Sequence, residues 1–345
     1  MAAASASLPP VKNGLDAAHA LLLNPIHDTE PPSPTKRHTK VTVVGVGNVG
    51  MAIVHAILSQ HLADELALID AQADKLRGEV LDLQHAAAFL PRTTIKSSTD
   101  VSSAAYSDLC IITAGARQRP EESRLDLLKR NVQILSAIVP RLARAAPNST
   151  ILVVSNPVDV LTYVTYRLSG FPANRVIGSG TNLDSSRFRF MIAEHLRVNA
   201  HDVQAYMVGE HGDSSVALWS SVSVGGVGIV GLVKGEDAVL EEMRERVVKS
   251  AYEVIALKGY TSWAIGYSVG SLAGTLLRDQ RKIQPVSVVA KGFHGIEEEV
   301  FLSLPAQLGR NGVIGVVNVE LTEEETKRLR ASAKKLWEVQ QELGI

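Results

Sequence analysis

The sequence predicts an α/β protein with a doubly wound parallel sheet, and three observations support this fold class. Short apolar runs typical of buried strands alternate with longer amphipathic stretches typical of helices. A glycine-rich turn at 45–50 joins the first strand to the first helix. A single acidic residue, Asp70, ends the second strand. Strands separated by helices pair in parallel through right-handed crossovers, which gives a sheet with helices on both faces.

The predicted elements follow one another closely from residue 40 onward. The first half alternates strands at 41–44, 66–69, 109–113 and 151–155 with helices at 51–62, 73–88 and 125–145. The second half predicts helices at 236–257, 263–277 and 322–343 and antiparallel strands at 286–290, 299–304 and 312–319. Thr322 and Glu325 have the spacing of a capping box for the last helix. We therefore expect a parallel-sheet domain followed by a C-terminal α+β catalytic domain.

Residues 1–39 differ from the rest and are expected to form an N-terminal arm. Six prolines interrupt this stretch, and it shows little periodicity. It lacks the charged start and long apolar core of a secretory signal, and it is poor in the arginine of organellar transit peptides. We expect the arm of a cytoplasmic protein, either flexible or packed on a neighbouring subunit.

The composition is that of a neutral globular protein. Hydrophobic residues make up 46% of the 345 residues, and 35 basic residues face 36 acidic ones. This balance indicates neither a nucleic acid nor an anionic membrane as partner. No apolar run reaches the roughly 18 residues of a membrane span. The single cysteine, Cys110, cannot form an internal disulfide, which fits a reducing compartment.

The turn at 45–50 has the glycine spacing of a dinucleotide-binding loop, and it follows a strand and opens a helix. Gly45 permits a tight turn, Gly47 lets the backbone approach a pyrophosphate, and Gly50 lets the helix pack closely on the strand. Asp70 comes twenty residues after Gly50 and is expected to accept hydrogen bonds from the adenosine ribose, while its charge disfavours a 2′-phosphate. The pattern predicts a Rossmann domain that prefers NAD to NADP. A purely structural turn is the alternative.

A polar loop at 113–124 leaves the third strand and contains Arg117, Arg119 and Arg124. Loops at the carboxyl ends of parallel strands lie over the crevice where such sheets bind ligands. Simple solvation is the alternative for any one of these arginines. The loop is also placed to act as a lid that carries one arginine inward and excludes water from the substrate.

Polar residues also follow the next strand ends. Asn156 either makes a turn or holds the nicotinamide ribose or ring through its amide. Residues 178–182 lead into a predicted helix in which Asp184 and Arg187 are three apart and share one face. An ordinary helical ion pair is the alternative for these two residues.

His211 lies between Glu210 and Asp213 on a turn flanked by glycines. A lone histidine is more often structural than catalytic. In this setting, however, Asp184 offers the imidazole an orienting partner and Arg187 offers a site for an anion. The three residues are therefore a candidate catalytic set.

Five motifs in a fixed order resemble those of the 2-hydroxyacid dehydrogenases of the lactate and malate type; they lie at 45–50, 113–118, 155–159, 183–187 and 209–213. Residues 258–264 and 310–313 look like later segments of the same family. The resemblance extends over roughly residues 40 to 340. It implies an NAD-binding Rossmann domain at 40–181, a substrate-binding and catalytic domain at 182–345, and a homotetramer.

The resemblance also implies a role for each residue of the candidate set. His211 resembles the family's proton acceptor, which takes the hydroxyl proton of a 2-hydroxy acid while hydride leaves C2 for the nicotinamide. Asp184 looks like the buried partner that fixes the tautomer of the imidazole. Arg187 looks like the bidentate clamp on the substrate carboxylate. Arg124 is similar to the lid arginine that polarises the C2 oxygen, so no metal is expected.

The remaining contacts implied by the resemblance follow the strand ends. Those expected for NAD are Gly45, Gly47, Asn48, Val49, Gly50, Asp70, Thr113, Ala114, Gly115, Asn156 and Ser179. Those expected for the substrate are Gln118, Arg124, Asn156, Arg187 and Thr261.

The choice of hydroxy acid depends on one position of the lid. In the family, the residue six before the closing arginine meets the substrate side chain, and here that residue is Gln118, six before Arg124. A neutral glutamine favours lactate and pyruvate. A shift of the loop by one residue would place Arg119 there instead and favour malate and oxaloacetate. Thr261 resembles the small residue that narrows the pocket, and the long N-terminal arm resembles the plant branch of the family's L-specific, lactate-oxidising members.

Overall fold

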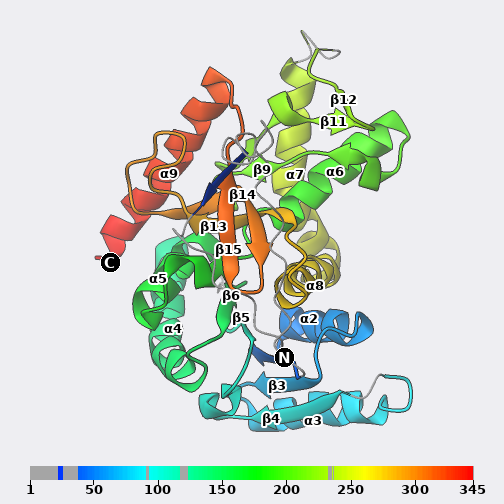
Figure 1. Cartoon of the computed structure of the whole chain (residues 1–345), viewed down its shortest axis with the longest axis vertical. Coiled ribbons are helices and arrows are strands. Elements are labelled where there is room, and N and C mark those ends of the chain that lie inside the picture. The colour runs from blue at the N-terminus through cyan, green and yellow to red at the C-terminus, as the bar shows by residue number, and fades with distance from the viewer. Residues whose placement is uncertain are drawn as a thin grey trace, which may run out of the picture.

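A mixed sheet of ten strands runs through the part of the chain that the structure describes (Figure 1). The structure is a computed structural model, and it describes residues 22–25, 38–90, 93–116, 123–231, 235 and 237–344. The strands lie in the order β1-β15-β14-β13-β7-β6-β5-β2-β3-β4. Six of them form the parallel half and four the antiparallel half.

The parallel half confirms the doubly wound sheet. Its strands are β2 (Lys40–Val44), β3 (Glu65–Ile69), β4 (Thr94–Ser98), β5 (Leu109–Ile112), β6 (Thr150–Val153) and β7 (Val176–Gly178). Numbered within this half, they have the spatial order 3-2-1-4-5-6 of a dinucleotide-binding fold. The order reverses between β2 and β5, so ligands are expected at the carboxyl ends of these two strands.

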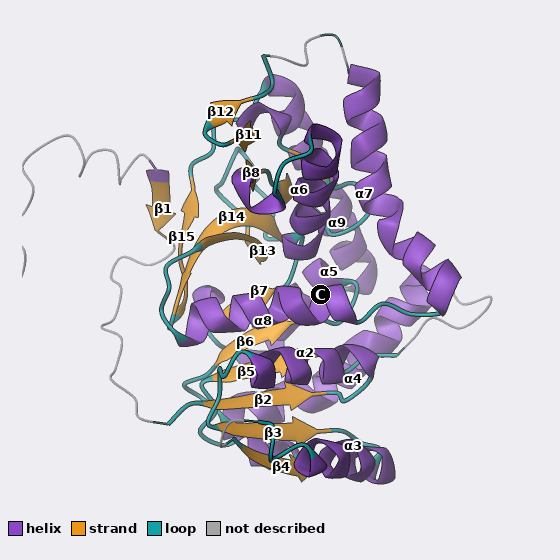
Figure 2. Cartoon of the chain, turned by 90° about the vertical axis from the view of Figure 1, so that its right-hand side faces the viewer, coloured by secondary structure: helices purple, strands orange, loops and turns teal. Residues whose placement is uncertain are grey.

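Helices cover both faces of the parallel half (Figures 1 and 2). They are α2 (Asn48–Ser59), α3 (Ala73–His85), α4 (Arg124–Ala145), α5 (Val158–Ser169) and, from the second half, α8 (Trp263–Leu277). Helices α4 and α5 pack together on one face, and α2 and α8 pack together on the other. Gly266 of α8 lies so close to α2 that a Cβ there would come within 2.7 Å of the Ala52 carbonyl oxygen. This contact docks the second half of the chain on the first.

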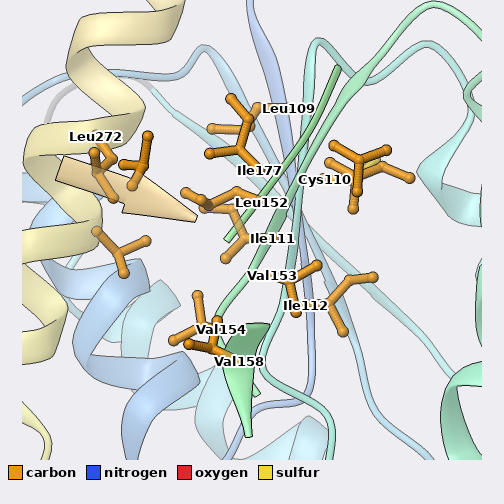
Figure 3. Close-up of a cluster of buried hydrophobic side chains, with 14 of the residues drawn as sticks. Leu109, Cys110, Ile111, Ile112, Leu152, Val153, Val154, Val158, Ile177 and Leu272 are labelled. Carbon is orange, nitrogen blue, oxygen red and sulfur yellow. The ribbon is translucent and has the colours of Figure 1, made fainter. Parts of the chain in front are cut away.

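The core lies between the sheet and these helices (Figure 3). Leu109 and Ile111 of β5 point toward the side of Leu272 of α8, while Cys110 points to the opposite side. All four are fully buried. Strands buried on both faces are apolar throughout rather than alternating, which explains the continuous apolar runs of the sequence. Burial also raises the pKa of the Cys110 thiol to about 11.

The second half extends the same sheet in the antiparallel sense. Its strands there are β13 (Ile283–Val289), β14 (Phe301–Gly309), β15 (Gly312–Val317) and β1 (Leu23–Pro25). Strand β13 pairs with β7 through Ser287 and Gly178, and this pair joins the two halves. Strand β1 comes from the arm and pairs with β15. The antiparallel prediction is confirmed, and the strands belong to the sheet of the first half.

Further elements complete the second half. The helices are α6 (Asn182–Leu196), α7 (Asp237–Lys258) and α9 (Glu323–Leu343). Short strands form two small sheets: β9 (Met207–Val208) with β10 (Val216–Ala217), and β8 (Val203–Gln204) with β11 (Ser223–Val224) and β12 (Val227–Gly228). The described residues also form four short 3-10 helices: η1 (Val101–Ala104) and η2 (Ala173–Arg175) in the first half, and η3 (Ala200–Asp202) and η4 (Trp219–Ser221) in the second.

The predicted capping box of the last helix is confirmed. The Thr322 hydroxyl accepts a hydrogen bond of 3.2 Å from the backbone N–H of Glu325, and the Glu325 carboxylate accepts one of 2.9 Å from the backbone N–H of Thr322. Glu325 also accepts two hydrogen bonds from Ser220. The start of α9 is thereby fixed on the loop that follows β10.

Candidate active site

The glycine turn lies at the carboxyl end of β2 and is shaped by close contacts. Gly45 has φ +100°, and a Cβ on it would lie 2.6 Å from the backbone nitrogen of Ala114. A Cβ on Gly50 would lie only 1.9 Å from the carbonyl oxygen of Gly45. A Cβ on Gly47, by contrast, would meet no atom within 4 Å. The turn is thus closed toward the protein and open at Gly47, as a pyrophosphate at the start of α2 requires.

Asp70, the residue after β3, is held against this turn. One of its carboxylate oxygens accepts a hydrogen bond of 2.8 Å from the backbone N–H of Val46, and the other accepts one of 2.9 Å from that of Gln72. A carboxylate has about four acceptor positions, so it can still accept hydrogen bonds from ribose hydroxyls. The turn and its acidic neighbour therefore fit a dinucleotide.

The ends of β5 and β6 join the turn through polar side chains. The Thr113 hydroxyl donates a hydrogen bond of 2.6 Å to the carbonyl oxygen of Gly45. Asn131 of α4, 2% exposed, accepts a hydrogen bond from the backbone N–H of Ala116 and donates one to the carbonyl oxygen of Asn156. Asn131 was not predicted from the sequence, because nothing in an amphipathic helix marks which polar residue faces inward.

Three other predicted cofactor residues lie at the same edge of the sheet. Gly115 is exposed just after β5, and Ser179 is buried just after β7. The side chain of Asn156 follows β6 and is exposed, and its Oδ1 accepts a hydrogen bond from the backbone N–H of Val158. The predicted cofactor residues thus gather at the carboxyl ends of neighbouring parallel strands.

Part of the predicted lid lies outside the described residues. Arg117, Gln118 and Arg119 belong to this part. Arg124 is the first residue of α4, and its side chain is not described. Ser123 precedes it as the N-cap, accepting a hydrogen bond from the backbone N–H of Asp126. The lid and the choice between Gln118 and Arg119 remain predictions.

The candidate catalytic set comes together as one connected group. Nδ1 of His211 lies 2.5 Å from Oδ2 of Asp184. The other oxygen of Asp184, Oδ1, accepts a hydrogen bond of 2.9 Å from Nη1 of Arg187. Asp184 is buried, whereas the side chains of Arg187 and His211 are 17% and 27% exposed. The ion pair considered as an alternative is present, and the same carboxylate also holds the histidine.

The loop that carries His211 is fixed to the sheet and to α6. Gly209, with φ +83°, forms a β-bridge with Ser303 of β14, with two hydrogen bonds of 2.9 Å. Two residues before Gly209, the carbonyl oxygen of Met207 accepts a hydrogen bond from the Thr181 hydroxyl, and the backbone N–H of Met207 donates one to the Ser185 hydroxyl. These bonds set the start of α6, and so Asp184, against the histidine loop.

Two buried side chains hold the backbone of the loop at the histidine itself. The N–H of Glu210 donates to the Ser332 hydroxyl of α9 at 2.8 Å, and the N–H of His211 donates to Oδ2 of Asp159 at 2.7 Å. Neither Asp159 nor Ser332 was given a role from the sequence. Asp159 ends a recognised motif, but its partner lies 52 residues further along the chain.

The surroundings of the imidazole favour its charged form. Burial acts to lower the pKa of His211, but the Asp184 carboxylate outweighs it, and the pKa rises to about 9. Burial acts to raise the pKa of Asp184, but His211 and Arg187 outweigh it, and this pKa is lowered. The group can therefore hold a proton at neutral pH and exchange it with a bound molecule. Nδ1 is occupied by Asp184, so Nε2 is the nitrogen left for that exchange.

The remaining predicted substrate residues border this group. Within the described residues, Arg187 makes no hydrogen bond besides that to Asp184, so the rest of its fork is available to an anion. Thr261 is half-buried in the segment between α7 and α8. In the described parts of the chain, no three His, Cys, Asp or Glu side chains are placed to hold a metal ion. No helix among the described residues is both long and apolar enough to cross a membrane.

Comparisons with known proteins show the family to which the chain belongs. A family model described as lactate/malate dehydrogenase, NAD binding domain, matches residues 39–178, and one described as lactate/malate dehydrogenase, alpha/beta C-terminal domain, matches residues 181–343. The chain is 64% identical to L-lactate dehydrogenase B of Hordeum vulgare, over 93% of this chain and 95% of that protein. It is 62% identical to L-lactate dehydrogenase of Zea mays, over 91% and 92%. It is 52% identical to the L-lactate dehydrogenase A chain of Trachemys scripta elegans, over 94% and 98%.

Proposed function

Because the chain belongs to the lactate/malate dehydrogenase family, with NAD as cofactor, we propose that it is an L-lactate dehydrogenase that interconverts (S)-lactate and pyruvate. The observation that carries this proposal is the Asp184 carboxylate, which holds both His211 and Arg187. In this group, His211 can exchange a proton and Arg187 can bind a carboxylate. The curated relatives named above are all called L-lactate dehydrogenases.

The chain's residues divide the chemistry between them. When bound, NAD would supply the acceptor for the hydride of lactate C2, and NADH the donor for the reverse reaction. His211 takes the hydroxyl proton through Nε2 during oxidation and gives it back to the ketone oxygen during reduction. Asp184 fixes the tautomer with the proton on Nδ1 and stabilises the imidazolium that forms.

The substrate is held by arginines. Arg187 binds the carboxylate of lactate with the nitrogens that Asp184 leaves unused. Arg124, at the start of α4, polarises the C2 oxygen and stabilises the charge that develops on it. Gln118 meets the methyl end of the substrate, with Thr261 narrowing the pocket and Asn156 orienting the ring. The predicted NAD contacts are Gly45, Gly47, Asn48, Val49, Gly50, Asp70, Thr113, Ala114, Gly115, Asn156 and Ser179.

Steady-state oxidation of NADH with a panel of 2-oxo acids tests the proposal. We expect a much higher kcat/KM with pyruvate than with oxaloacetate, and the reverse order would make the chain a malate dehydrogenase. That second candidate depends on Arg119, the neighbour of Gln118. If Gln118 faces the substrate, Gln118→Arg raises oxaloacetate use sharply, because a cation then meets the second carboxylate. Arg119→Gln serves as the matched control and leaves the preference for pyruvate unchanged.

We also propose an assembly, a compartment and a division of the chain. A homotetramer is favoured by a run of exposed apolar side chains from the end of α7 into α8, which includes Tyr252, Ile255, Leu257, Trp263 and Tyr267.

A cytoplasmic location is favoured by the single reduced cysteine. Residues 40–181 carry the cofactor turn and residues 182–345 the histidine loop, with 1–39 as an arm.

A further inference from the structure

A second buried carboxylate, Asp159, contacts the histidine from another element. Asp159 lies in the first turn of α5 and is only 2% exposed. Its Oδ2 accepts the hydrogen bond of 2.7 Å from the backbone N–H of His211. Its Oδ1 is buried and has no hydrogen-bond partner within the described part of the chain. Among the described residues, its one hydrogen bond of normal length goes to the histidine, and the Ser287 hydroxyl is the other polar group that favours its charged form.

The buried position is unfavourable for the ionised carboxylate of Asp159. Burial raises the pKa of Asp159 to about 6. The Ser287 hydroxyl, the backbone N–H of His211 and the positive end of the α5 dipole offset part of this cost. The charge acts on the imidazole, because Asp159 follows Asp184 among the groups that raise the pKa of His211. Titratable groups held in unfavourable surroundings are concentrated at functional sites.

The other charged groups around the imidazole do not replace Asp159. They are Asp184 and Arg187 from α6, Glu210 from the histidine's own loop, and Lys335 from α9. Asp184 and Arg187 have opposite charges and form an ion pair, so their effects on the imidazole partly cancel. Glu210 is likewise paired with Lys335, at 2.9 Å. Asp159 forms no ion pair among the described residues, and the His211 imidazole is the cation that acts on its charge.

We propose that Asp159 is a positioning residue that fixes the main chain of His211 and supplies the second negative charge beside its imidazole. Asp184 orients the ring through the side chain, and Asp159 holds the same residue through the backbone. The two carboxylates come from different halves of the chain. This inference rests on the proposed role of His211 as proton donor and acceptor.

Two substitutions of Asp159 separate the effect of its hydrogen bond to the His211 backbone from the effect of its negative charge. Asp159→Asn keeps an oxygen that can accept from the N–H of His211 but removes the charge. We expect it to lower the pKa of His211 by about one unit. The rate at which diethylpyrocarbonate modifies His211, followed by mass spectrometry of its peptide across neutral and alkaline pH, measures this pKa without any substrate. The alkaline limb of pyruvate reduction shifts by the same amount.

Asp159→Ala removes the anchor as well. We expect kcat for pyruvate to fall about tenfold further than in Asp159→Asn, because the loop then loses its hold on the histidine. The affinity for NADH, measured by fluorescence, stays within about twofold in both variants, since the glycine turn is untouched. Normal NADH binding also shows that each variant is folded. If Asp159→Ala does not fold, the asparagine variant carries the test.

Ser332→Ala is the matched control, because Ser332 anchors the preceding N–H but has no charge. It leaves the pKa of His211 unchanged. The proposal is wrong if Asp159→Asn also leaves this pKa unchanged, or if Asp159→Ala keeps the kcat of the native protein. A native protein that binds NADH but does not reduce pyruvate would contradict the proposed function instead, and the modification assay would still decide the role of Asp159.

Discussion

At the scale of single residues, the protonation of His211 is governed by two carboxylates on different helices. Asp184 lies beside the ring and Asp159 beside the backbone. An imidazole with a pKa near 9 is charged at neutral pH, so it is ready to donate a proton to a ketone. Lactate oxidation requires the neutral imidazole, which becomes more populated as the pH rises toward 9.

Replacing the histidine tests its role most directly. We expect His211→Asn to lower kcat for pyruvate reduction by about 100- to 10,000-fold, the usual range for a lost acid–base group. NADH binding, measured by fluorescence quenching, is expected to remain normal because the turn at 45–50 is intact. Unchanged turnover would mean that another group transfers the proton.

The pH dependence tests the pair of His211 and Asp184. Because the folded pKa of His211 is raised above 6.5, its stabilising effect is fully present below 6.5 and is lost as the pH rises through about 9. Pyruvate reduction needs the charged form and falls over the same range, whereas lactate oxidation rises. Asp184→Asn removes the main raising group, so we expect the limb of kcat/KM to move toward 6.5 or below. A limb that stays near 9 would contradict the pairing.

Sequence reasoning identified the candidate catalytic side chains, but not the residues that hold their loop. Local spacing placed Asp184 and Arg187 on one helix face and His211 on a glycine turn, and the resemblance to the family indicated that they act together. Asp159 and Ser332 act on the same loop from 52 and 122 residues away. Only the folded topology brings them there, and no local pattern encodes it.

At the scale of elements, the glycine turn depends on contacts between backbones. We expect Gly50→Ala to lower the free energy of unfolding by about 1–3 kcal/mol, because the new Cβ overlaps the Gly45 carbonyl. NADH affinity falls as well, since the turn and α2 must separate. Urea denaturation and NADH titration measure the two effects.

Gly78 provides the matched control for this substitution. It lies in α3, is exposed, and has no atom within 4 Å of the position of a Cβ. Gly78→Ala is expected to stabilise the protein by about 0.5–1 kcal/mol through helix propensity. Equal losses in the two variants would show that close packing at Gly50 is not the cause.

Element prediction succeeded where burial gave a clear pattern. Helix α8 matches its predicted range of 263–277, and the capping box marks the start of α9. Strand β4 was missed because its residues are mostly exposed and polar, and β7 because it has only three residues. Helix α5 was not predicted, since its apolar run resembles a strand as much as a buried helix.

At the scale of the whole molecule, the proposed subunit interface is the exposed apolar run over α7 and α8. We expect light scattering to give a mass of about 148 kDa, four times the chain mass of 37.0 kDa. Leu257→Glu, at a side chain 81% exposed, is expected to shift the protein to smaller species. Phe89→Glu, at one 89% exposed elsewhere, is the control and keeps the native mass. A monomer in the unmodified protein would contradict the proposed assembly.

Cys110 is buried in the sheet, so the rate at which its thiol is labelled measures how often this part of the native protein unfolds. Its thiol is inaccessible and its raised pKa suppresses the reactive thiolate, so a thiol reagent can react only when β5 is exposed. We expect slow labelling in the native protein, and labelling about 100-fold slower when NADH is present at 100 times its Kd. Labelling that NADH does not slow would show that β5 opens independently of the cofactor turn. A single sulfur atom thus reports how strongly cofactor occupancy protects the enzyme from unfolding.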